Sequence, residues 1–307
     1  MADFEERAPA VIADPLERWL KAALGDPGRA GVFLDFDGTL SDIVATPDEA
    51  TAVPGAVEAL ASLAERLGRV AVVSGRPVAY LAEHLAGRGG TELIGLYGMQ
   101  AESGTGRGVA GRGAACRYRT VSGPELERWR EAVETAAAGA EDAGFASLSV
   151  ERKSLSVALH YRSNPAAAPA VKDLAAALAR RSGLSVHQGK MSVELAPALG
   201  IDKGTVVTEG SSGLQAVMFA GDDVGDLAAF RAVDRLAAQG VATLKVTLGG
   251  EELPVEVMRA ADVVLDGPAA LVELLRRMSA LAGATRPSEV SDSLGGPRPG
   301  PGSARST

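Results

Sequence analysis

The sequence alternates short apolar segments with amphipathic helical patterns over most of its 307 residues. The apolar segments are nearly continuous, as in "VFLDF" at 32–36 and "VAVVSG" at 70–75. Strands of this kind, separated by helices, are typical of a parallel sheet covered on both faces. We therefore predict an α/β core with a doubly wound, Rossmann-like parallel sheet. The predicted strands are 32–36, 70–75, 93–98, 216–223, 244–249 and 261–267, and the predicted helices are 54–67, 77–86, 224–232, one from about 203 and one ending near 283.

The middle of the chain has a different pattern. Helical spacing at 123–142 and 166–181 is followed each time by segments in which apolar and polar residues alternate, at 145–162 and 184–197. Period-2 alternation with turn residues between the runs is typical of antiparallel hairpins with one polar face. We therefore predict an inserted α+β cap domain that repeats a helix–hairpin unit twice around an antiparallel sheet.

These patterns divide the chain into four parts. A short amphipathic helix at 14–24 belongs to an N-terminal extension, and the chain after residue 284 is rich in Pro, Gly and Ser, which predicts a disordered tail. The predicted parts are an N-terminal helical extension at 1–29, a core formed by 30–112 and 199–284, an inserted domain at 113–198 and a tail at 285–307.

Composition narrows the class of protein. Hydrophobic residues make up 46% and charged residues 23%, as in ordinary globular proteins, and the net charge of −8 offers no basic footprint for nucleic acid. Cys116 is the only cysteine, which fits a reducing compartment. The acidic N-terminus "MADFEERAPAV" lacks the basic region of a signal peptide, and no apolar run reaches the ~18 residues that span a bilayer. We expect a cytoplasmic protein that does not bind membranes, and its oligomeric state stays open.

Acidic residues gather where predicted strands end. Asp35 and Asp37 lie at the end of the first strand, and Asp222, Asp223 and Asp226 follow a later one. Ligands bind beyond the carboxyl ends of the strands in doubly wound sheets, and several carboxylates there suit Mg²⁺. The alternative is that these acids cap helices or keep loops soluble. That alternative stays open for Asp226 and for Asp42.

Two cations occupy predicted helix starts, where a positive charge opposes the helix dipole. Lys203 lies in "GIDKGTVV", and Arg76 precedes Pro77. A phosphate bound between these helix N-termini would offset both charges. Solvent exposure is the alternative for either residue taken alone.

The order of these motifs resembles the haloacid dehalogenase superfamily. "DFDGTL" is similar to its first motif, the end of "VVSGR" to its second, Lys203 to its third and "GDDVGD" to its fourth. With "SGRP", "ERKSLSVALHYR" and "GKMSVELAP", residues 30 to 280 more closely resemble trehalose-6-phosphate phosphatases. Two residues depart from that family: Gly225 stands where further polar residues are common, and Tyr97 where many members have His.

The resemblance implies a phosphoryl-transfer site. Asp35 would be the nucleophile that forms an aspartyl-phosphate, and Asp37 would protonate the leaving sugar and later activate water. Asp223 or Asp226 would orient metal-bound water or Lys203. The implied Mg²⁺ ligands are Asp35, Asp37 through its backbone carbonyl, Asp222 and Asp223, and the phosphate would be held by Lys203, Ser74, Gly38, Thr39, Gly75 and Arg76.

The resemblance also places sugar recognition in the cap. The alternative for each charged cap residue is an exposed ion pair. The residues implied to bind sugar hydroxyls are Glu151, Lys153, Lys190 and Glu194, in or beside the hairpin turns, with Arg162 and His160 as helpers; His84 and His187 are expected to be ordinary histidines.

The expected function is therefore Mg²⁺-dependent hydrolysis of trehalose 6-phosphate to trehalose and phosphate. A phosphatase of another sugar phosphate, such as sucrose phosphate or a glycosylated phosphoglycerate, is an alternative. A non-catalytic module that binds a sugar phosphate is a further one, because a fold does not determine a function.

Overall fold

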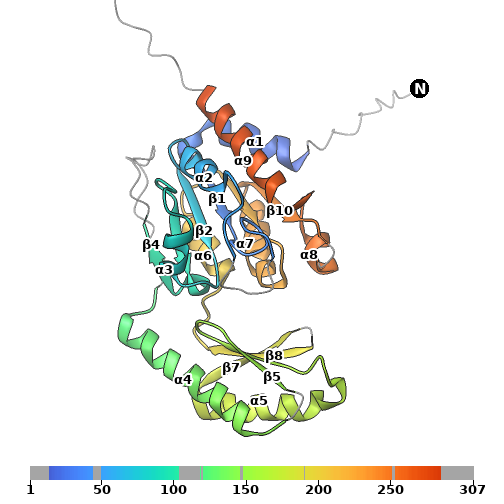
Figure 1. Ribbon diagram of the computed structural model, residues 1–307. Helices are drawn as coiled ribbons and strands as arrows, with labels where there is room; N and C mark the ends of the chain where they lie inside the picture. Colours follow the sequence, from blue (N-terminus) through green and yellow to red (C-terminus); the bar gives the residue numbers. More distant parts are fainter. Residues whose placement is uncertain are drawn as a thin grey trace, which may run out of the picture.

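The computed structural model describes residues 14–43, 50–103, 118, 120–145, 148–189, 191–250 and 253–284. It contains two sheets, one of seven strands and one of four (Figure 1). In the part of the chain described, no helix combines the length and apolar character that a membrane crossing requires. Expectations for residues 1–13, Cys116, Lys190 and the tail lie outside the described residues.

The larger sheet has the predicted doubly wound topology. Its strand order is β11-β10-β9-β1-β2-β3-β4, and all neighbouring strands are parallel except β3 and β4. The chain order reverses between β1 and β9, which is where such sheets bind ligands. The strands are β1 (Ala30–Leu34), β2 (Arg69–Val73), β3 (Glu92–Gly95), β4 (Gln100–Glu102), β9 (Ala216–Ala220), β10 (Ala242–Leu248) and β11 (Val263–Leu265).

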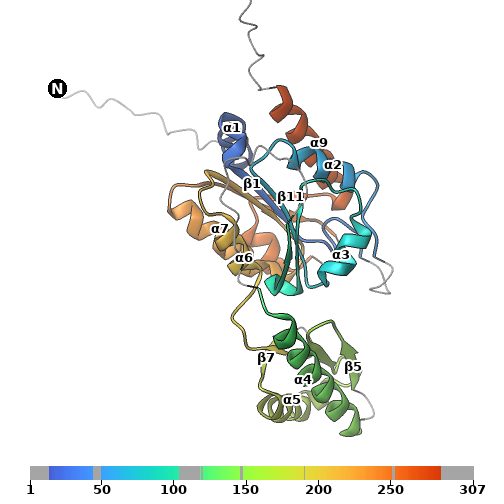
Figure 2. The same cartoon turned by 90° about the vertical axis from the view of Figure 1, so that its left-hand side faces the viewer.

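Helices cover both faces of this sheet because successive residues of a strand point to opposite sides. In β1, Val32 and Leu34 pack into one hydrophobic cluster and Phe33 into the other. Burying each such side chain contributes about 1.5–3 kcal/mol. The first cluster includes residues of α1 (Pro15–Gly25), α2 (Ala56–Ala64), α3 (Val78–His84) and α9 (Gly267–Ala284), and the second includes residues of α6 (Lys203–Gly210), α7 (Leu227–Ala238) and α8 (Val255–Ala260). In Figure 2, α2, α3 and α9 lie on one side of the sheet and α6 and α7 on the other.

The smaller sheet confirms the repeated helix–hairpin unit. Its strands are antiparallel in the order β5-β6-β8-β7, and its helices bury one face through Val157, Leu159, Val193 and Leu195. The helix α5 lies on the side of this sheet away from the core (Figure 1). The elements are α4 (Gly123–Asp142), β5 (Ser149–Arg152), β6 (Val157–His160), α5 (Ala168–Ser182), β7 (Leu184–Gly189) and β8 (Ser192–Pro197).

The structure differs from the sequence patterns in three details. β1 ends at Leu34 and not at residue 36 as predicted, so Asp35 and Asp37 both lie in the loop beyond the strand. The antiparallel edge strand β4 and the helix α8 were not predicted, because three and six residues are too few to establish a period. Within the described ranges, short 3-10 turns also connect elements: η1 (Pro27–Arg29), η3 (Leu96–Gly98), η4 (Pro165–Ala167) and η5 (Val224–Asp226).

Candidate active site

A polar pocket of about 460 Å³ lies where the carboxyl ends of β1, β2 and β9 face the first hairpin of the cap. Asp35, Ser74 and Asp222 each follow one of these strands, as predicted from the topology. The lining residues are Asp35, Asp37, Gly38, Asp42, Ile43, Ser74, Gly75, Arg76, Tyr97, Glu151, Arg152, Lys153, Ser154, Leu155, Ser156, Lys203, Asp222 and Asp223.

The loop after β1 requires glycine at one position. Gly38 has a φ of 71°, and a Cβ there would lie 2.1 Å from an Asp222 carboxylate oxygen. Thr39 follows it and donates its hydroxyl to Asp222 over 3.0 Å. The loops after β1 and β9 therefore touch only because residue 38 has no side chain.

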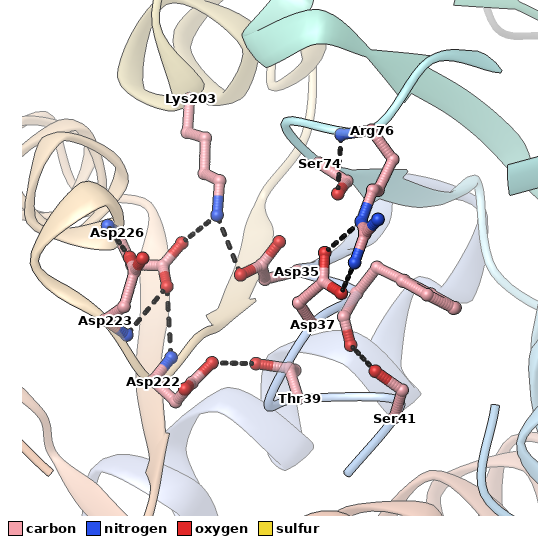
Figure 3. Close-up of polar contacts among 11 residues, drawn as sticks. Asp35, Asp37, Thr39, Ser41, Ser74, Arg76, Lys203, Asp222, Asp223 and Asp226 are labelled. Carbon is pink, nitrogen blue, oxygen red and sulfur yellow. Dashed lines mark hydrogen bonds and ion pairs between the residues drawn. The ribbon is translucent and has the colours of Figure 1, made fainter. Parts of the chain in front are cut away.

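Lys203 connects two buried acids at the centre of the site (Figure 3). Its ammonium lies 2.8 Å from Asp35 and 2.7 Å from Asp226, and all three side chains are almost fully buried. Burial lowers the pKa of Lys203, but the carboxylates of Asp226 and Asp35 outweigh it and raise that pKa well above its ordinary value. Burial raises the pKa of Asp35, against the opposing effect of Lys203. The predicted cation at the start of α6 is thus offset by carboxylates in the free protein.

Asp226 is the acid that positions Lys203. Besides the ammonium, its side chain accepts the backbone N–H groups of Asp222 and Asp223, over 3.0 and 3.1 Å. Asp223 instead caps η5, where its side chain accepts the N–H of Asp226 over 3.2 Å. Of the two acids left open by the sequence, Asp226 lies inside the charged cluster and Asp223 at its exposed edge.

Asp35 and Asp37 point in different directions. Asp37 receives two hydrogen bonds from the Arg76 guanidinium, of 2.9 and 2.7 Å, while Asp35 faces Lys203 (Figure 3). The guanidinium also lies 4.7 Å above the ring centre of Tyr80. Arg76 is therefore bound to a protein carboxylate in this state.

The acids at the strand ends fit a hard divalent cation. Oxygen atoms of Asp35, Asp222 and Asp226 lie within 4.8 Å of one another. Burial, with Asp226 and Asp223 next, raises the pKa of Asp222 to about 7, so the carboxylates repel one another without a cation among them. Asp226 is already engaged with Lys203 and two N–H groups, which leaves Asp35 and Asp222 as the better placed donors.

The loop at 74–76, which follows β2 and is called here the second-motif loop, packs against an unusual turn at 96–98. Ser74 accepts the Arg76 N–H over 3.2 Å, and the carbonyls of Ser74 and Arg76 accept the N–H groups of Tyr97 and Leu96. Leu96 and Tyr97 both have positive φ, 51° and 59°, which costs about 1–3 kcal/mol for each residue with a side chain. This turn holds Tyr97 against Gly75 inside the pocket.

The cap contributes part of its polar face to the site. Glu151 and Lys153 line the pocket, and Glu151 contacts His160 over 2.7 Å. Glu194 accepts the Ser156 hydroxyl and lies 3.5 Å from the Lys153 ammonium. The sequence predicted that Glu194 lies in or beside a hairpin turn. In the structure it is instead the third residue of β8.

The remaining cap residues are less informative. Arg162 follows β6 with an exposed side chain and does not line the pocket, and Lys190 lies outside the described residues. His84 stacks on Tyr80 in the core, with ring centres 3.9 Å apart. His187 lies opposite Glu194 in the β7–β8 pairing.

Comparison with known proteins agrees with this geometry. The sequence model of the trehalose-phosphatase family matches residues 33–256. This chain belongs to that family. A trehalose-phosphate phosphatase of Mycobacterium avium is 34% identical over 287 residues, which cover 89% of this chain and 68% of that protein. An uncharacterized glycosyl hydrolase of Mycobacterium tuberculosis is 37% identical over 224 residues, which cover 67% of this chain but 15% of that protein.

Solved structures show the same fold. The C-terminal domain of trehalose-6-phosphate phosphatase from Candida albicans has a TM-score of 0.63 at 20% identity, and the match covers 87% of this chain and 96% of that one. A haloacid dehalogenase-like hydrolase from Bacteroides thetaiotaomicron has a TM-score of 0.52 at 18% identity, covering 81% and 99%. The core and cap of this trehalose-phosphatase family member therefore have the haloacid dehalogenase-type architecture.

Sequence reasoning missed two features of the site. The first is the pairing of Asp226 with Lys203. The sequence could not distinguish Asp226 from Asp223 as the partner of Lys203, since the capping signal of "GDDVGD" is the same for either acid. The second is the backbone turn that places Tyr97 at the pocket, although this residue had been noted as a departure from the family at a possible ligand contact. The glycines around it in "GLYG" were the available signal, because they mark a tight turn at a strand end.

Proposed function

We propose that this protein is a Mg²⁺-dependent phosphatase that hydrolyses trehalose 6-phosphate to trehalose and phosphate. The observation that carries the proposal is the pocket itself. It joins a buried Asp35–Lys203 pair with polar residues of the cap hairpin, Glu151 and Lys153. A binding module needs no buried nucleophile at the floor of its pocket, whereas a phosphatase does.

In the proposed reaction, an Asp35 carboxylate oxygen attacks phosphorus as the bond between phosphorus and the sugar oxygen breaks. Asp37 donates a proton to that oxygen, and trehalose leaves. Water then attacks the phosphorus of the aspartyl-phosphate, Asp37 takes a proton from the water, and inorganic phosphate and free Asp35 result. Acid–base assistance of this kind is worth roughly 10²–10⁴-fold in rate.

Charge on the transferred phosphoryl group would be balanced by this chain's own donors. Lys203, Ser74 and the N–H groups of Gly38 and Thr39 are the proposed ligands of its oxygens, with Gly75 beside them. Mg²⁺, held by Asp35, Asp222 and the Asp37 carbonyl, with Asp223 as a further predicted ligand, would supply positive charge between nucleophile and phosphate.

Arg76 has a defined task in this scheme. In the free protein it binds both oxygens of Asp37, so Asp37 would leave Arg76 to reach the sugar oxygen. The phosphate can replace Asp37 as the partner of the guanidinium, because Arg binds either group in a bidentate manner.

Sugar selectivity is proposed to come from the cap. Glu151, Lys153 and Glu194 offer acceptors and donors to sugar hydroxyls, and Lys190 and Arg162 remain predicted contributors. A cytoplasmic location also stays a prediction.

The test is phosphate release from a panel of sugar phosphates, with Mg²⁺ and after its removal by chelation. We expect trehalose 6-phosphate to have the highest kcat/KM and chelation to abolish turnover. Preference for sucrose phosphate or a glycosylated phosphoglycerate would replace the substrate assignment. Binding of sugar phosphates without any turnover in Mg²⁺ would identify a non-catalytic module.

A further inference from the structure

The turn that carries Tyr97 has an unusual backbone. Leu96, Tyr97 and Gly98 have φ values of 51°, 59° and 117°. Positive φ is rare for residues with a side chain and is a true outlier for a bulky one. Glycine at residue 98 is explained by packing, since a Cβ there would lie 2.7 Å from Val206. Leu96 is explained as well, because it is 1% exposed in a cluster with Leu155. Tyr97 needs a separate explanation.

The backbone of the turn is clamped to the second-motif loop. The N–H of Tyr97 donates to the Ser74 carbonyl and that of Leu96 to the Arg76 carbonyl, each over 2.9 Å. The Tyr97 ring lies on Gly75, the residue between Ser74 and Arg76. A Cβ added to Gly75 would come within 2.7 Å of the Cζ and the hydroxyl of Tyr97. Ring and hydroxyl are therefore held next to Ser74 with little freedom to turn away.

Tyr97 belongs to the lining of the pocket, and its hydroxyl lies beside Gly75, another lining residue. The pocket is also lined by Asp35 and Lys203 of the core and by Lys153 of the cap. Among the described residues, no hydrogen bond engages this hydroxyl. Burial, and next the charge of Glu194, raises the pKa of the Tyr97 hydroxyl, so it stays protonated and can donate. A phenol in such a position normally finds a partner.

We propose that Tyr97 is a specificity-determining residue that binds the sugar unit carrying the phosphate, with its hydroxyl hydrogen-bonded to a sugar hydroxyl. This inference rests on the proposed function and deepens it. With the phosphate between Asp35, Ser74 and Lys203, the first sugar would extend toward Glu151 and Lys153, and Tyr97 lines the same pocket as these residues. The face of the aromatic ring can pack on C–H groups of the sugar, and the phenol hydroxyl can form a hydrogen bond with a sugar O–H group. The backbone of residues 96–98 is then explained by the need to hold this side chain over Gly75.

The test compares Tyr97→Phe with the wild type on trehalose 6-phosphate and on p-nitrophenyl phosphate, which has no sugar. The substitution removes one oxygen and keeps the ring on Gly75. We expect the ratio of kcat/KM for the sugar phosphate to that for the aryl phosphate to fall roughly 10- to 100-fold, because a sugar hydroxyl loses its partner. Tyr118→Phe is the matched control. Its hydroxyl donates to Glu92 outside the pocket, so the ratio should not change.

Each other outcome has a distinct meaning. An equal loss on both substrates would show that Tyr97 supports the phosphate site, and an unchanged ratio would show that it only packs on Gly75; either result overturns the assignment and leaves the proposed function intact. If the wild type prefers another sugar phosphate, the test uses the ratio of kcat/KM for that sugar phosphate to kcat/KM for p-nitrophenyl phosphate, and a fall in this ratio in Tyr97→Phe supports the assignment. A wild type inactive on every sugar phosphate would overturn the proposed function, and this inference with it.

Discussion

At the scale of single residues, the site is a balance of buried charges. Lys203 lies between Asp35 and Asp226, so the three side chains carry one excess negative charge when all are ionised. Burying such a group is costly unless every member is paired. Asp35 lies against the Lys203 ammonium and lines the pocket, the position that the proposed nucleophile requires. Asp226 faces the protein and has its oxygens occupied.

Asp35→Asn should abolish turnover of both sugar and aryl phosphates. The amide cannot form the acyl-phosphate, yet it keeps the shape of the side chain, so the protein should remain folded. Phosphate release and the circular dichroism spectrum are the two measurements. Near-normal turnover by this variant would exclude the covalent route through Asp35.

Asp226→Ala should destabilise the protein far more than Asp223→Ala. Removing Asp226 leaves a buried ammonium short of one partner, which typically costs about 3–5 kcal/mol. Removing Asp223 deletes an exposed cap, which costs about 0.5–2 kcal/mol. The free energies of unfolding come from urea titration of both variants. Equal losses would mean that Asp226 acts only as a loop residue.

At the scale of elements, the first cap hairpin contacts the core through an apolar cluster. Leu155, in its turn, is 4% exposed and packs in one cluster with Leu96 and Met99 of the core and Leu126 of α4. The same turn carries Lys153 and Ser154 into the pocket. An apolar contact therefore holds this hairpin over the pocket, and polar residues of the same hairpin line that pocket.

Leu155→Ala should loosen this contact. Deleting the buried side chain costs about 2–5 kcal/mol of local or global stability. We expect faster amide hydrogen exchange in β5 and β6 and a higher KM for trehalose 6-phosphate. Val186→Ala on β7 is the control, because that side chain is 38% exposed and should change neither measurement. Unchanged exchange in Leu155→Ala would show that other contacts hold the hairpin.

At the scale of the whole molecule, the proposed function divides chemistry and selectivity between two sheets. Strands of the core end at the proposed phosphate site, and the cap presents the polar face of its own sheet, with Glu151, Ser156 and Glu194. Such lids exclude water from a reactive intermediate and position the leaving group. The two functions can therefore be separated by mutation.

Glu194→Ala should reduce kcat/KM for trehalose 6-phosphate by roughly 10²-fold or more, with at most a few-fold change for p-nitrophenyl phosphate. Glu127→Ala is the matched control, since Glu127 pairs with Arg130 on α4 of the cap and neither residue lines the pocket. Steady-state kinetics on both substrates give the answer. A parallel fall on the two substrates would assign Glu194 to the fold or the chemistry.

The sequence by itself determined the architecture and much of the site. Periods of 2 and 3.6 residues are local properties, so they indicated the parallel core and the repeated helix–hairpin unit without tertiary information. The rule that parallel strands end at one edge then brought Asp35, Ser74 and Asp222 together, although these residues are far apart in the chain. For Lys203, its place at a helix start suggested a site residue, but solvent exposure stayed an alternative until the structure buried it between two acids.

Only the tertiary structure decided how the side chains are paired. That Asp226 binds Lys203, that Asp37 turns to Arg76 and that Glu194 meets Ser156 depends on contacts between residues 23 to 39 positions apart. No local period encodes such contacts, because they arise from where each strand ends and how each loop bends. Tyr97 is the clearest case: its placement depends on a positive φ and on the absence of a side chain at Gly75, two conditions that arise only when both loops meet.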